Sequence, residues 1–438
     1  MAENTVLDNN MSPIIKKKEV PKLRFPEFNT FWDKISFNDI FDILQNNTYT
    51  RADLNYKDGN TKNIHYGDIL IKFDEYINVQ QKCIPFINGE NTLSKFKAES
   101  YLKDGDIIIA DTAEDETVGK VTEISNAKEQ KILSGLHTIP CRPKRKFAPM
   151  FLGFYMNSKS FHKQLIPLIT GIKVSSISKT SIATTTISVP TFEEQEKISK
   201  FLVVINKMIK EQESNISILE TYNRGLLNDI FEGRVKFKNK DGEKYPDWEE
   251  KILSEEFPFI RNGFVGIVTD HFSDKEHGVR YIEGTNIHNG RIDDNVEVYV
   301  TKEFHQKHKK NELKSDDIVM VQSGHVGDCA VVGSKYAGSN CHALIIMSNG
   351  GKADSHYVAK YFLSDVGKKK LEILKTGNTV KHILSSDMNK FKLPFPCLEE
   401  QQKIADCLSA IDKVLQQEKV YLEQLKTIKK GLLQQMFV

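Results

Sequence analysis

The chain of 438 residues lacks the features that mark several large classes of protein. No apolar run approaches the ~20 residues that a membrane-spanning helix needs. The segment Met1 to Asn10 contains no apolar core of the kind found in a secretory signal. The six cysteines are scattered and form no CxxC pair, which argues against a zinc site and against a disulfide framework. We therefore expect a protein of the reducing cytoplasm.

Catalytic motifs are also missing. The sequence has no P-loop, dinucleotide-binding glycine motif, nucleophile elbow or H-E-x-x-H pair. Pro246 to Lys251 offers fragments of a nuclease metal site, but its carboxylates lie too close together in sequence to converge on one Mg²⁺. The acidic cluster of Asp111 and Glu114 to Glu116 fits a solvated turn better than a metal site. We expect no catalytic site, metal or cofactor in this chain.

Charge does not decide the partner. The net charge is +2, from 61 basic and 59 acidic residues. Nucleic-acid binding depends on where charge is clustered rather than on the total, so this balance neither indicates nor excludes it. The length is too great for one compact core and predicts two or more domains.

The chain contains two copies of one unit. Glu193 to Ile198 (EEQEKI) matches Glu399 to Ile404 (EEQQKI), an offset of 206 residues, and a Gly-Leu-Leu tripeptide recurs at the same offset. Upstream the offset drifts and reaches 216 at the only two tryptophans, Trp32 and Trp248. Each unit therefore has a tryptophan-containing opening, a globular part, a proline and a helix. The globular parts diverge more than the helices, as expected if the two domains bind different things.

Each unit ends in a long helix with a narrow apolar seam. The apolar steps are mostly four and three, a spacing typical of a coiled coil, and one polar residue interrupts each seam. The predicted seam is Ile198, Leu202, Ile205, Ile209, Gln212, Ile216 and Leu219, continuing to Tyr222 and Leu226, and Ile404, Leu408, Ile411, Leu415, Glu418, Leu422 and Leu425, continuing to Ile428 and Leu432. Such a helix needs a partner. We expect the two helices to pair antiparallel, with dimerisation to a second chain as the alternative.

The globular parts predict mixed α/β domains. Short β-type runs such as Asp106 to Ala110 and Asp317 to Val321 alternate with turns, and helical periodicity returns at Phe151 to Ile169 and Tyr357 to Leu374. The expected fold class is α+β, with two mixed α/β domains in tandem, separated and linked by two long antiparallel coiled-coil helices with pseudo-twofold symmetry. The predicted segments are a flexible tail (1–20), domains (21–190 and 238–396) and helices (191–237 and 397–438).

Two kinds of segment suit contact with phosphate. The loops Thr170 to Val174 and Thr376 to His382 each follow a predicted helix and combine glycine, hydroxyl and lysine groups, which allow backbone amides to approach phosphate closely. Basic residues also gather in Arg142 to Lys146 and in Lys302 to Lys310. Such runs are more often solvated faces than binding sites, and both interpretations stay open here.

Taken together, these features resemble the specificity subunit of bacterial type I restriction-modification systems. The similar segments are two spacer helices (Pro190 to Phe231 and Pro396 to Phe437), two domain openings (Phe28 to Ile35 and Tyr245 to Ile252) and two parts of the target-recognition domains (Asn63 to Ile69 and Tyr281 to Ile287). The resemblance covers nearly the whole chain, and the helices are its most specific part.

The resemblance implies a division of labour. Each domain would read one half of a bipartite DNA site in the major groove, and the helix pair would set the number of unread base pairs between the halves. The subunit would carry no catalytic site or cofactor of its own. It would bind two methyltransferase subunits, which use S-adenosylmethionine, and join restriction subunits, which use ATP and Mg²⁺, in the bacterial cytoplasm and away from membranes.

The residues expected to contact double-stranded DNA come from the loops, the basic runs and one recognition-domain segment. They are Thr170, Gly171, Lys173, Lys144, Arg145, Arg280, Asn286, Lys302, Lys309, Lys310, Gly377, Thr379, Lys381 and His382. The competing interpretation is a two-domain coiled-coil scaffold that binds proteins without reading DNA. A self-sufficient nuclease or methyltransferase is disfavoured, because neither chemistry has its residues in this sequence.

Overall fold

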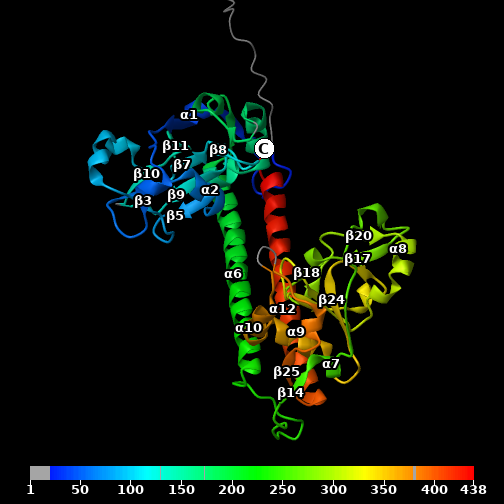
Figure 1. Cartoon of the computed structure of the whole chain (residues 1–438). Helices are drawn as coiled ribbons and strands as arrows, with labels where there is room; N and C mark the ends of the chain where they lie inside the picture. Colours follow the sequence, from blue (N-terminus) through cyan, green and yellow to red (C-terminus); the bar gives the residue numbers. More distant parts are fainter. Residues whose placement is uncertain (1–19, 129, 172, 378–380) are drawn as a thin grey trace, which may run out of the picture. The chain divides into compact units, whose positions relative to one another are not determined.

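The computed structural model describes residues 20–128, 130–171, 173–377 and 381–438 (Figure 1). The chain divides into two compact units. Unit 1 contains the residues up to Gln212 together with Tyr421–Val438, and unit 2 contains Glu213–Val420. The two long helices, α6 (Phe192–Phe231) and α12 (Leu398–Gln435), each contribute one part to either unit. Each unit therefore holds one globular domain, here called domain 1 or domain 2, and a segment of both helices.

Domain 1 is a mixed α/β structure. Its strands are β1 (Asp33–Ser36), β2 (Phe41–Ile43), β3 (Leu54–Asn55), β4 (Thr61–Ile64), β5 (Tyr76–Asn78), β6 (Phe86–Ile87), β7 (Ile107–Ala110), β8 (Thr112–Ala113), β9 (Val121–Ser125), β10 (Lys131–Ser134), β11 (Thr138–Pro143), β12 (Ser175–Ser176) and β13 (Thr186–Val189). Its α-helices are α1 (Phe37–Ile40), α2 (Tyr66–Ile71), α3 (Phe151–Met156), α4 (Lys159–Leu165) and α5 (Lys179–Ile182). The largest sheet has the order β2-β11-β7-β9-β5.

Domain 2 repeats this plan. Its strands are β14 (Glu249–Ile252), β15 (Phe259–Asn262), β16 (Phe272–Ser273), β17 (Val279–Ile282), β18 (Ile287–His288), β19 (Arg291–Ile292), β20 (Val298–Val300), β21 (Ile318–Val321), β22 (Cys329–Val331), β23 (Asn340–Cys341), β24 (Leu344–Ser348) and β25 (Lys392–Phe395). Its α-helices are α7 (Leu253–Glu256), α8 (Lys302–Lys307), α9 (Ser355–Leu363), α10 (Asp365–Leu374) and α11 (Ser385–Met388). The order β15-β24-β21-β22 corresponds to β2-β11-β7-β9.

The central strand of each main sheet is buried on both faces, which is why its sequence is an unbroken apolar run. In β7, Ile107 and Ile109 pack into the core that contains α3 and α4, and Ile108 and Ala110 pack into the core that contains α2. The strand β21 divides its four side chains between two cores in the same alternating way. The side chains of these strands stabilise the core, so they are not available to a ligand.

The helical regions predicted at 151–169 and 357–374 are each two helices. Ser158 follows α3 and caps α4, where its hydroxyl accepts from the Phe161 amide at 3.4 Å. Ser364 caps α10 in the same way, accepting from Gly367 at 3.0 Å. The two serines are 206 residues apart, so the helix break belongs to the repeat.

A glutamate at the start of each long helix bonds the tryptophan of the domain opening. The Trp32 indole Nε1 donates to Glu194 Oε1 at 3.3 Å, and the Trp248 Nε1 donates to Glu400 Oε2 at 3.0 Å. Both glutamates are buried. This bond explains why the tryptophans and the Glu-Glu-Gln motifs occur together in both copies.

The glutamine that follows fixes the helix to the domain backbone. The Gln195 amide accepts from the Ala148 N–H and donates to the Pro190 carbonyl, both at 3.0 Å. Gln401 makes the two corresponding bonds, at 2.9 and 2.8 Å, with the residues at the +206 positions. Because each amide is buried and satisfied on both sides, the helix start and the domain form one unit.

The two helix segments run antiparallel within each unit. In unit 1, Ile198 near the start of α6 shares a core with Phe437, which follows α12. In unit 2, Ile230 near the end of α6 shares a core with Ile404 and Leu408 near the start of α12. The packing partner of each helix segment is therefore a segment of the same chain, as the sequence predicted.

Burial follows most of the predicted seam. The buried members are Ile198, Leu202, Ile209, Gln212, Ile216, Ile404, Leu408 and Leu425, and the partly buried members are Ile205, Leu219, Ile411, Leu415, Glu418 and Leu422. The continuation to Tyr222 and Ile428 was wrong, because these side chains are 59% and 52% exposed. At these turns the adjacent Asn223 and Lys429 make the inward contacts instead.

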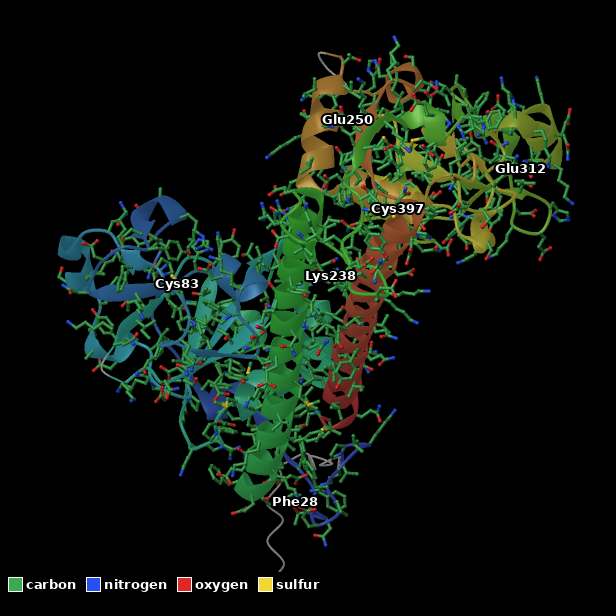
Figure 2. The ribbon with its side chains drawn as sticks, turned by 90° about the horizontal axis from the view of Figure 1, so that it is seen from below. Phe28, Cys83, Lys238, Glu250, Glu312 and Cys397 are labelled. Atoms are coloured by element: carbon green, nitrogen blue, oxygen red, sulfur yellow. The ribbon has the colours of Figure 1, made fainter. Side chains whose placement is uncertain are left out.

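Two other expectations concern the whole chain. Within the described ranges, no helix is both long and apolar enough to span a membrane. All six cysteines are free thiols; Cys83 and Cys397, both labelled in Figure 2, are exposed. Cys397 lies directly before α12, and its backbone carbonyl accepts the Gln401 N–H.

We predict that Gln401→Ala lowers the free energy of unfolding by about 1–3 kcal/mol, because it leaves a buried N–H and a buried carbonyl without partners. The measurement is urea denaturation of the purified chain. The adjacent Gln402→Ala is the matched control: Gln402 is exposed, so its loss should cost less than about 0.5 kcal/mol. Equal losses for the two variants would show that the buried amide bonds do not hold the junction.

Candidate nucleic-acid interface

The first glycine loop, residues 170–176, is a tight hairpin. The backbones of Thr170 and Ser176 exchange hydrogen bonds of 2.9 and 2.8 Å. Gly171 has φ +109°, and a Cβ at this position would lie 2.0 Å from the Val174 carbonyl oxygen, so only glycine fits. Lys173 is exposed at the tip of the loop. The loop therefore presents an exposed ammonium group next to a position that only glycine fits.

This loop lies against the end of the central strand. Ser175 and Ser176 form β12, which pairs antiparallel with β8, directly after β7. His137 joins the same place: its backbone carbonyl accepts the Asp111 N–H at 3.1 Å, and its Nδ1 lies 3.3 Å from Thr112 Oγ1. The Tyr66 ring contacts the His137 ring at a centroid distance of 5.2 Å. Four separate segments therefore meet at this end of domain 1.

The second glycine loop, residues 376–382, has the same placement in domain 2. Thr376 and His382 exchange backbone hydrogen bonds of 3.0 and 2.9 Å, and His382 also bridges to Ser323, which follows β21. His325, from the same post-strand loop, lies 6.5 Å from the His288 ring. Gly377 has φ +101°, close to that of Gly171. The glycine loop and the loop after the central strand are thus neighbours in both domains.

The lysine of the second loop differs from that of the first. Lys381 Nζ lies 2.9 Å from Glu372 Oε1. Lys375 and Lys381 together lower the pKa of this glutamate to about 2, through hydrogen bonds and charge. The expected contact Thr379 lies outside the described residues. Lys381 therefore already has an anionic neighbour, whose place a phosphate would have to take or share.

Lys144 and Arg145 lie at the opposite end of the sheet from the first glycine loop. They follow β11, whereas His137 precedes it, and a six-residue strand at about 3.3 Å per residue separates the two ends by roughly 17 Å. Lys144 Nζ bonds the Asn38 carbonyl at 2.7 Å and approaches Asp42 at 3.3 Å. The Arg145 guanidinium lies over the Phe147 ring. The structure does not bring the two predicted groups of domain 1 together.

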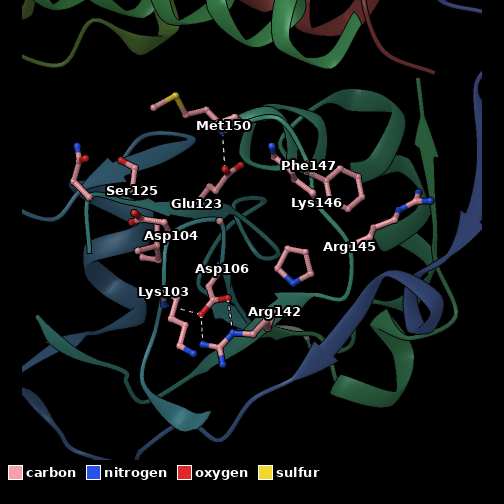
Figure 3. A pocket seen from close by; sticks show the side chains of 15 residues that line it. Lys103, Asp104, Asp106, Glu123, Ser125, Arg142, Arg145, Lys146, Phe147 and Met150 are labelled. Carbon is pink, nitrogen blue, oxygen red and sulfur yellow. Dashed lines mark hydrogen bonds and ion pairs between the residues drawn. The ribbon is translucent and has the colours of Figure 1, made fainter. Parts of the chain in front are cut away.

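A cavity of about 480 Å³ opens beside this basic run (Figure 3). Its charged groups bond one another: Arg142 holds Asp106 at 2.9 and 2.6 Å, and Glu123 accepts the backbone N–H groups of Met150 and Gly153. Burial raises the pKa of Glu123 to about 7. Glu123 provides the N-terminal cap of α3, so this end of the domain has a structural role.

The basic run of domain 2 is only partly a solvated face. Lys302 and Lys310 are exposed, whereas Lys309 forms an ion pair with Glu312. The two histidines in the run are packing residues: His305 is buried, and the His308 ring lies 4.5 Å from Phe304. Burial, with a smaller effect of nearby lysines, lowers the pKa of His308. Apart from Lys309, the exposed lysines that this run offers to a phosphate are Lys302, Lys307 and Lys310.

Arg280 and Asn286 are corrected as DNA contacts. Asn286 is 1% exposed, and its amide bonds the backbone of Glu283, Asp293 and Val296. The Arg280 guanidinium donates to three backbone carbonyls, among them that of Val296. Both side chains hold the chain that surrounds β18 and β19. The sequence suggested DNA contacts because both residues are polar and lie in a segment that resembles a recognition domain. A buried residue that bonds the backbone has the same polar character, and the sequence does not distinguish the two roles.

Sequence analysis missed the residues that surround the glycine loops. Thr112, His137 and Tyr66 in domain 1, and Ser323 and His325 in domain 2, meet the loops from other segments. One repeated pattern in the sequence does indicate the post-strand loops. The run Leu102 to Ile107 (LKDGDI) resembles Leu313 to Ile318 (LKSDDI), and each run leads into the apolar central strand that the loop follows. Among the described residues, no group of His, Cys, Asp or Glu side chains is placed to hold a metal ion.

The family profile described as the type I restriction modification DNA specificity domain matches the chain twice, at residues 29–220 and 222–427. Among curated relatives, the putative MjaX specificity subunit of Methanocaldococcus jannaschii is 26% identical over 432 residues, which is 95% of both chains. The MjaVIII specificity subunit of the same organism is 24% identical over 278 residues, covering 60% of this chain and 64% of the relative.

Solved structures share the fold. An S subunit of a type I restriction-modification system from M. genitalium aligns with a TM-score of 0.53 at 14% identity, covering 96% of this chain and 99% of that one. A chain from a study of type I complex assembly aligns with a TM-score of 0.58 at 15% identity, covering 92% and 96%. Two tandem mixed α/β domains on long helices are thus an established architecture. The chain belongs to the type I restriction-modification DNA specificity family, as the non-catalytic subunit that gives a multi-subunit complex its DNA sequence specificity.

Proposed function

We propose that domain 1 (21–190) and domain 2 (238–396) each read one half of a bipartite DNA site with the end that carries the glycine loop. The two spacer helices (191–237 and 397–438) set the number of base pairs between the half-sites. The chain binds two methyltransferase subunits, which carry S-adenosylmethionine, and a complete complex adds restriction subunits with ATP and Mg²⁺. The chain itself contributes recognition and spacing.

One observation carries this proposal. The two domains share the bonds that join them to the long helices, and they differ in the loops that follow the central strand. The tryptophan, glutamate and glutamine bonds and the buried central strand are the same in both domains. The loops beyond the strand differ, with Thr112 in one domain and Ser323 and His325 in the other, and His137 joins Thr112 from the turn before β11. Different side chains at one shared position are what two different base sequences require.

The glycine loops favour this end over the basic run of domain 1. Each loop has a glycine with positive φ and an exposed lysine, which suit an approach to phosphate, and the neighbouring hydroxyl and imidazole groups can bond base edges. Lys144 and Arg145 instead lie against domain 1 itself, and the adjacent Lys146 lies over Phe192 at the start of α6. A gel shift of the purified complex on genomic fragments tests the readout, because a protein-binding scaffold without DNA readout would retard no fragment specifically.

We predict that Lys173→Ala weakens DNA binding on all sequences and lowers the slope of log affinity against log salt by about one. The measurement is fluorescence anisotropy of the assembled complex at several salt concentrations, with specific and unrelated duplexes. Because the lysine contacts phosphate in this proposal, the ratio of specific to unspecific affinity should change little.

Lys144→Ala is the matched control, because it removes the same charge from the opposite end of the same sheet. It should leave the affinity and the salt slope unchanged. If Lys144→Ala flattens the slope and Lys173→Ala does not, the wrong end of domain 1 has been assigned to DNA.

We predict that removing residues 211–214 from α6 and the equivalent residues 417–420 from α12 shortens the gap between half-sites and leaves their sequences unchanged. Four residues are about 6 Å of helix, which corresponds to about one or two base pairs. Methylome sequencing of cells that carry the variant gives both the half-sites and the gap.

The control keeps the length and removes the side chains, by changing the same eight positions to alanine. This variant should retain the original gap. Altered half-sites with an unchanged gap in the deletion variant would contradict the role of the helices in spacing.

A further inference from the structure

Each domain is also joined to its helices by a cluster of charged and amide groups, and the first cluster takes its acid from the domain. Glu75, directly before β5, is 9% exposed. Its carboxylate accepts from Lys429 Nζ of α12 at 2.7 and 2.9 Å and from Asn206 Nδ2 of α6 at 3.0 Å. We name Glu75, Asn206 and Lys429 junction cluster 1. One carboxylate from domain 1 thus bonds both helices.

The second cluster takes its acid from a helix. Asp412 of α12 forms an ion pair with Lys360 of α9 and accepts from Asn223 Nδ2 of α6 at 2.9 Å. Arg291 of β19 donates to the Asp412 backbone carbonyl at 2.6 Å. We name Asp412, Asn223, Lys360 and Arg291 junction cluster 2. Here the cations come from the domain and the carboxylate comes from the helix.

The helix members of the two clusters occupy equivalent positions. Asp412 lies 206 residues after Asn206, and Lys429 lies 206 residues after Asn223. At one position the helices carry Asn206 in unit 1 and Asp412 in unit 2. At the other they carry Lys429 in unit 1 and Asn223 in unit 2. The helix site is therefore cationic in unit 1 and anionic in unit 2.

The domain members come from comparable places. The position of Lys360 corresponds to Phe154 in domain 1, by the same offset. Arg291 follows Gly290, which bridges in parallel to β22, just as β5 pairs in parallel with β9. Glu75 and Arg291 thus come from the same edge of the main sheet and carry opposite charges.

We propose that this reversal of polarity makes each recognition domain specific for its own part of the helix pair. The tryptophan–glutamate bond and the two glutamine bonds cannot do so, because they are the same in both units. The clusters differ between the units and therefore can distinguish the domains. The exposed pair Arg224–Asp365 in unit 2 is screened by solvent and contributes little.

Exchanging the domains would place like charges together. Domain 2 on the unit 1 helix site would place Lys360 at Asn206, beside the Lys429 ammonium, and domain 1 on the unit 2 site would place Glu75 at Asp412. The ion-paired side chains of both clusters are at most 23% exposed, so solvent would not remove the repulsion. The polarity thus opposes the wrong arrangement as well as stabilising the right one.

The test combines two domain orders with two sets of helix side chains in the full-length chain. One pair of variants keeps the native order, and the other pair has residues 21–190 and 238–396 exchanged. Each order is made with native helices and with Asn206→Asp, Lys429→Asn, Asp412→Asn and Asn223→Lys, which swaps the helix sites. Two of these chains are mismatched: the native order on swapped helices and the exchanged order on native helices. In thermal unfolding, both should melt about 5–10 °C below wild type. The exchanged order on swapped helices should regain more than half of the lost melting temperature.

The matched control swaps another equivalent helix pair, Lys200→Asp with Asp406→Lys, in both domain orders. Both positions are exposed, so this swap should move the melting temperature by less than about 2 °C and should not rescue the exchanged order. Exchanged domains that melt like wild type on native helices would overturn the proposal. So would swapped helices that give the exchanged order no recovery.

If the exchanged chains do not fold on either set of helices, charge-reversal variants of the chain in its native domain order test the proposal instead. Lys429→Glu should lower the melting temperature by placing two carboxylates together, and adding Glu75→Lys should restore more than half of the loss. In unit 2, Lys360→Glu should be restored by Asp412→Lys in the same way. Absence of rescue in both units would overturn the proposal.

Discussion

Each long helix has near its start a buried glutamine that makes two hydrogen bonds to the domain backbone. These two bonds fix the position of the domain on its helix. Gln195 bonds the backbone just before α3 and the backbone just before α6, so two elements that leave the domain in different directions share one amide. The preceding Glu194 adds the domain opening through Trp32. Because a buried amide that loses one partner is costly, neither element can shift alone. The domain and the helix that carries it are therefore positioned together.

This support leaves one end of each domain free to differ. The central strands β7 and β21 are buried on both faces, so their side chains are constrained by packing. The loops beyond these strands lie at the surface beside the glycine loops and have no such constraint. A change of Thr112 or Ser323 alters what the domain presents without altering how it is held. The arrangement suits a protein whose support must be constant while its recognition surface varies.

The sequence predicted those features that recur at a fixed offset or period. The repeat, the long helices and the strand runs around 106–110 and 317–321 were all found in this way, since each depends on local spacing. Asn286 shows where such reasoning fails: a polar residue in a recognition-like segment is buried because distant carbonyls need its amide. The bond between Glu75 and Lys429 joins residues 354 apart in sequence, and no spacing rule indicates it. The error at Tyr222 and Ile428 has the same origin, because the neighbouring Asn223 and Lys429 bond partners distant in sequence, Asp412 of α12 and Glu75 of domain 1.

A duplicated scaffold creates a problem that its repeated contacts cannot solve. When both junctions use the same tryptophan, glutamate and glutamine, these contacts alone do not distinguish one domain from the other, and only the covalent order places domain 1 before α6 and domain 2 before α12. A match between a domain and its junction therefore needs groups that lie at equivalent positions and differ in charge. Asn206 and Asp412, with Asn223 and Lys429, meet both conditions. A charge reversal at two sites leaves the apolar residues of the helix seam unchanged, because none of these four positions belongs to the seam. The repeat can therefore keep its common geometry while each domain retains its own place.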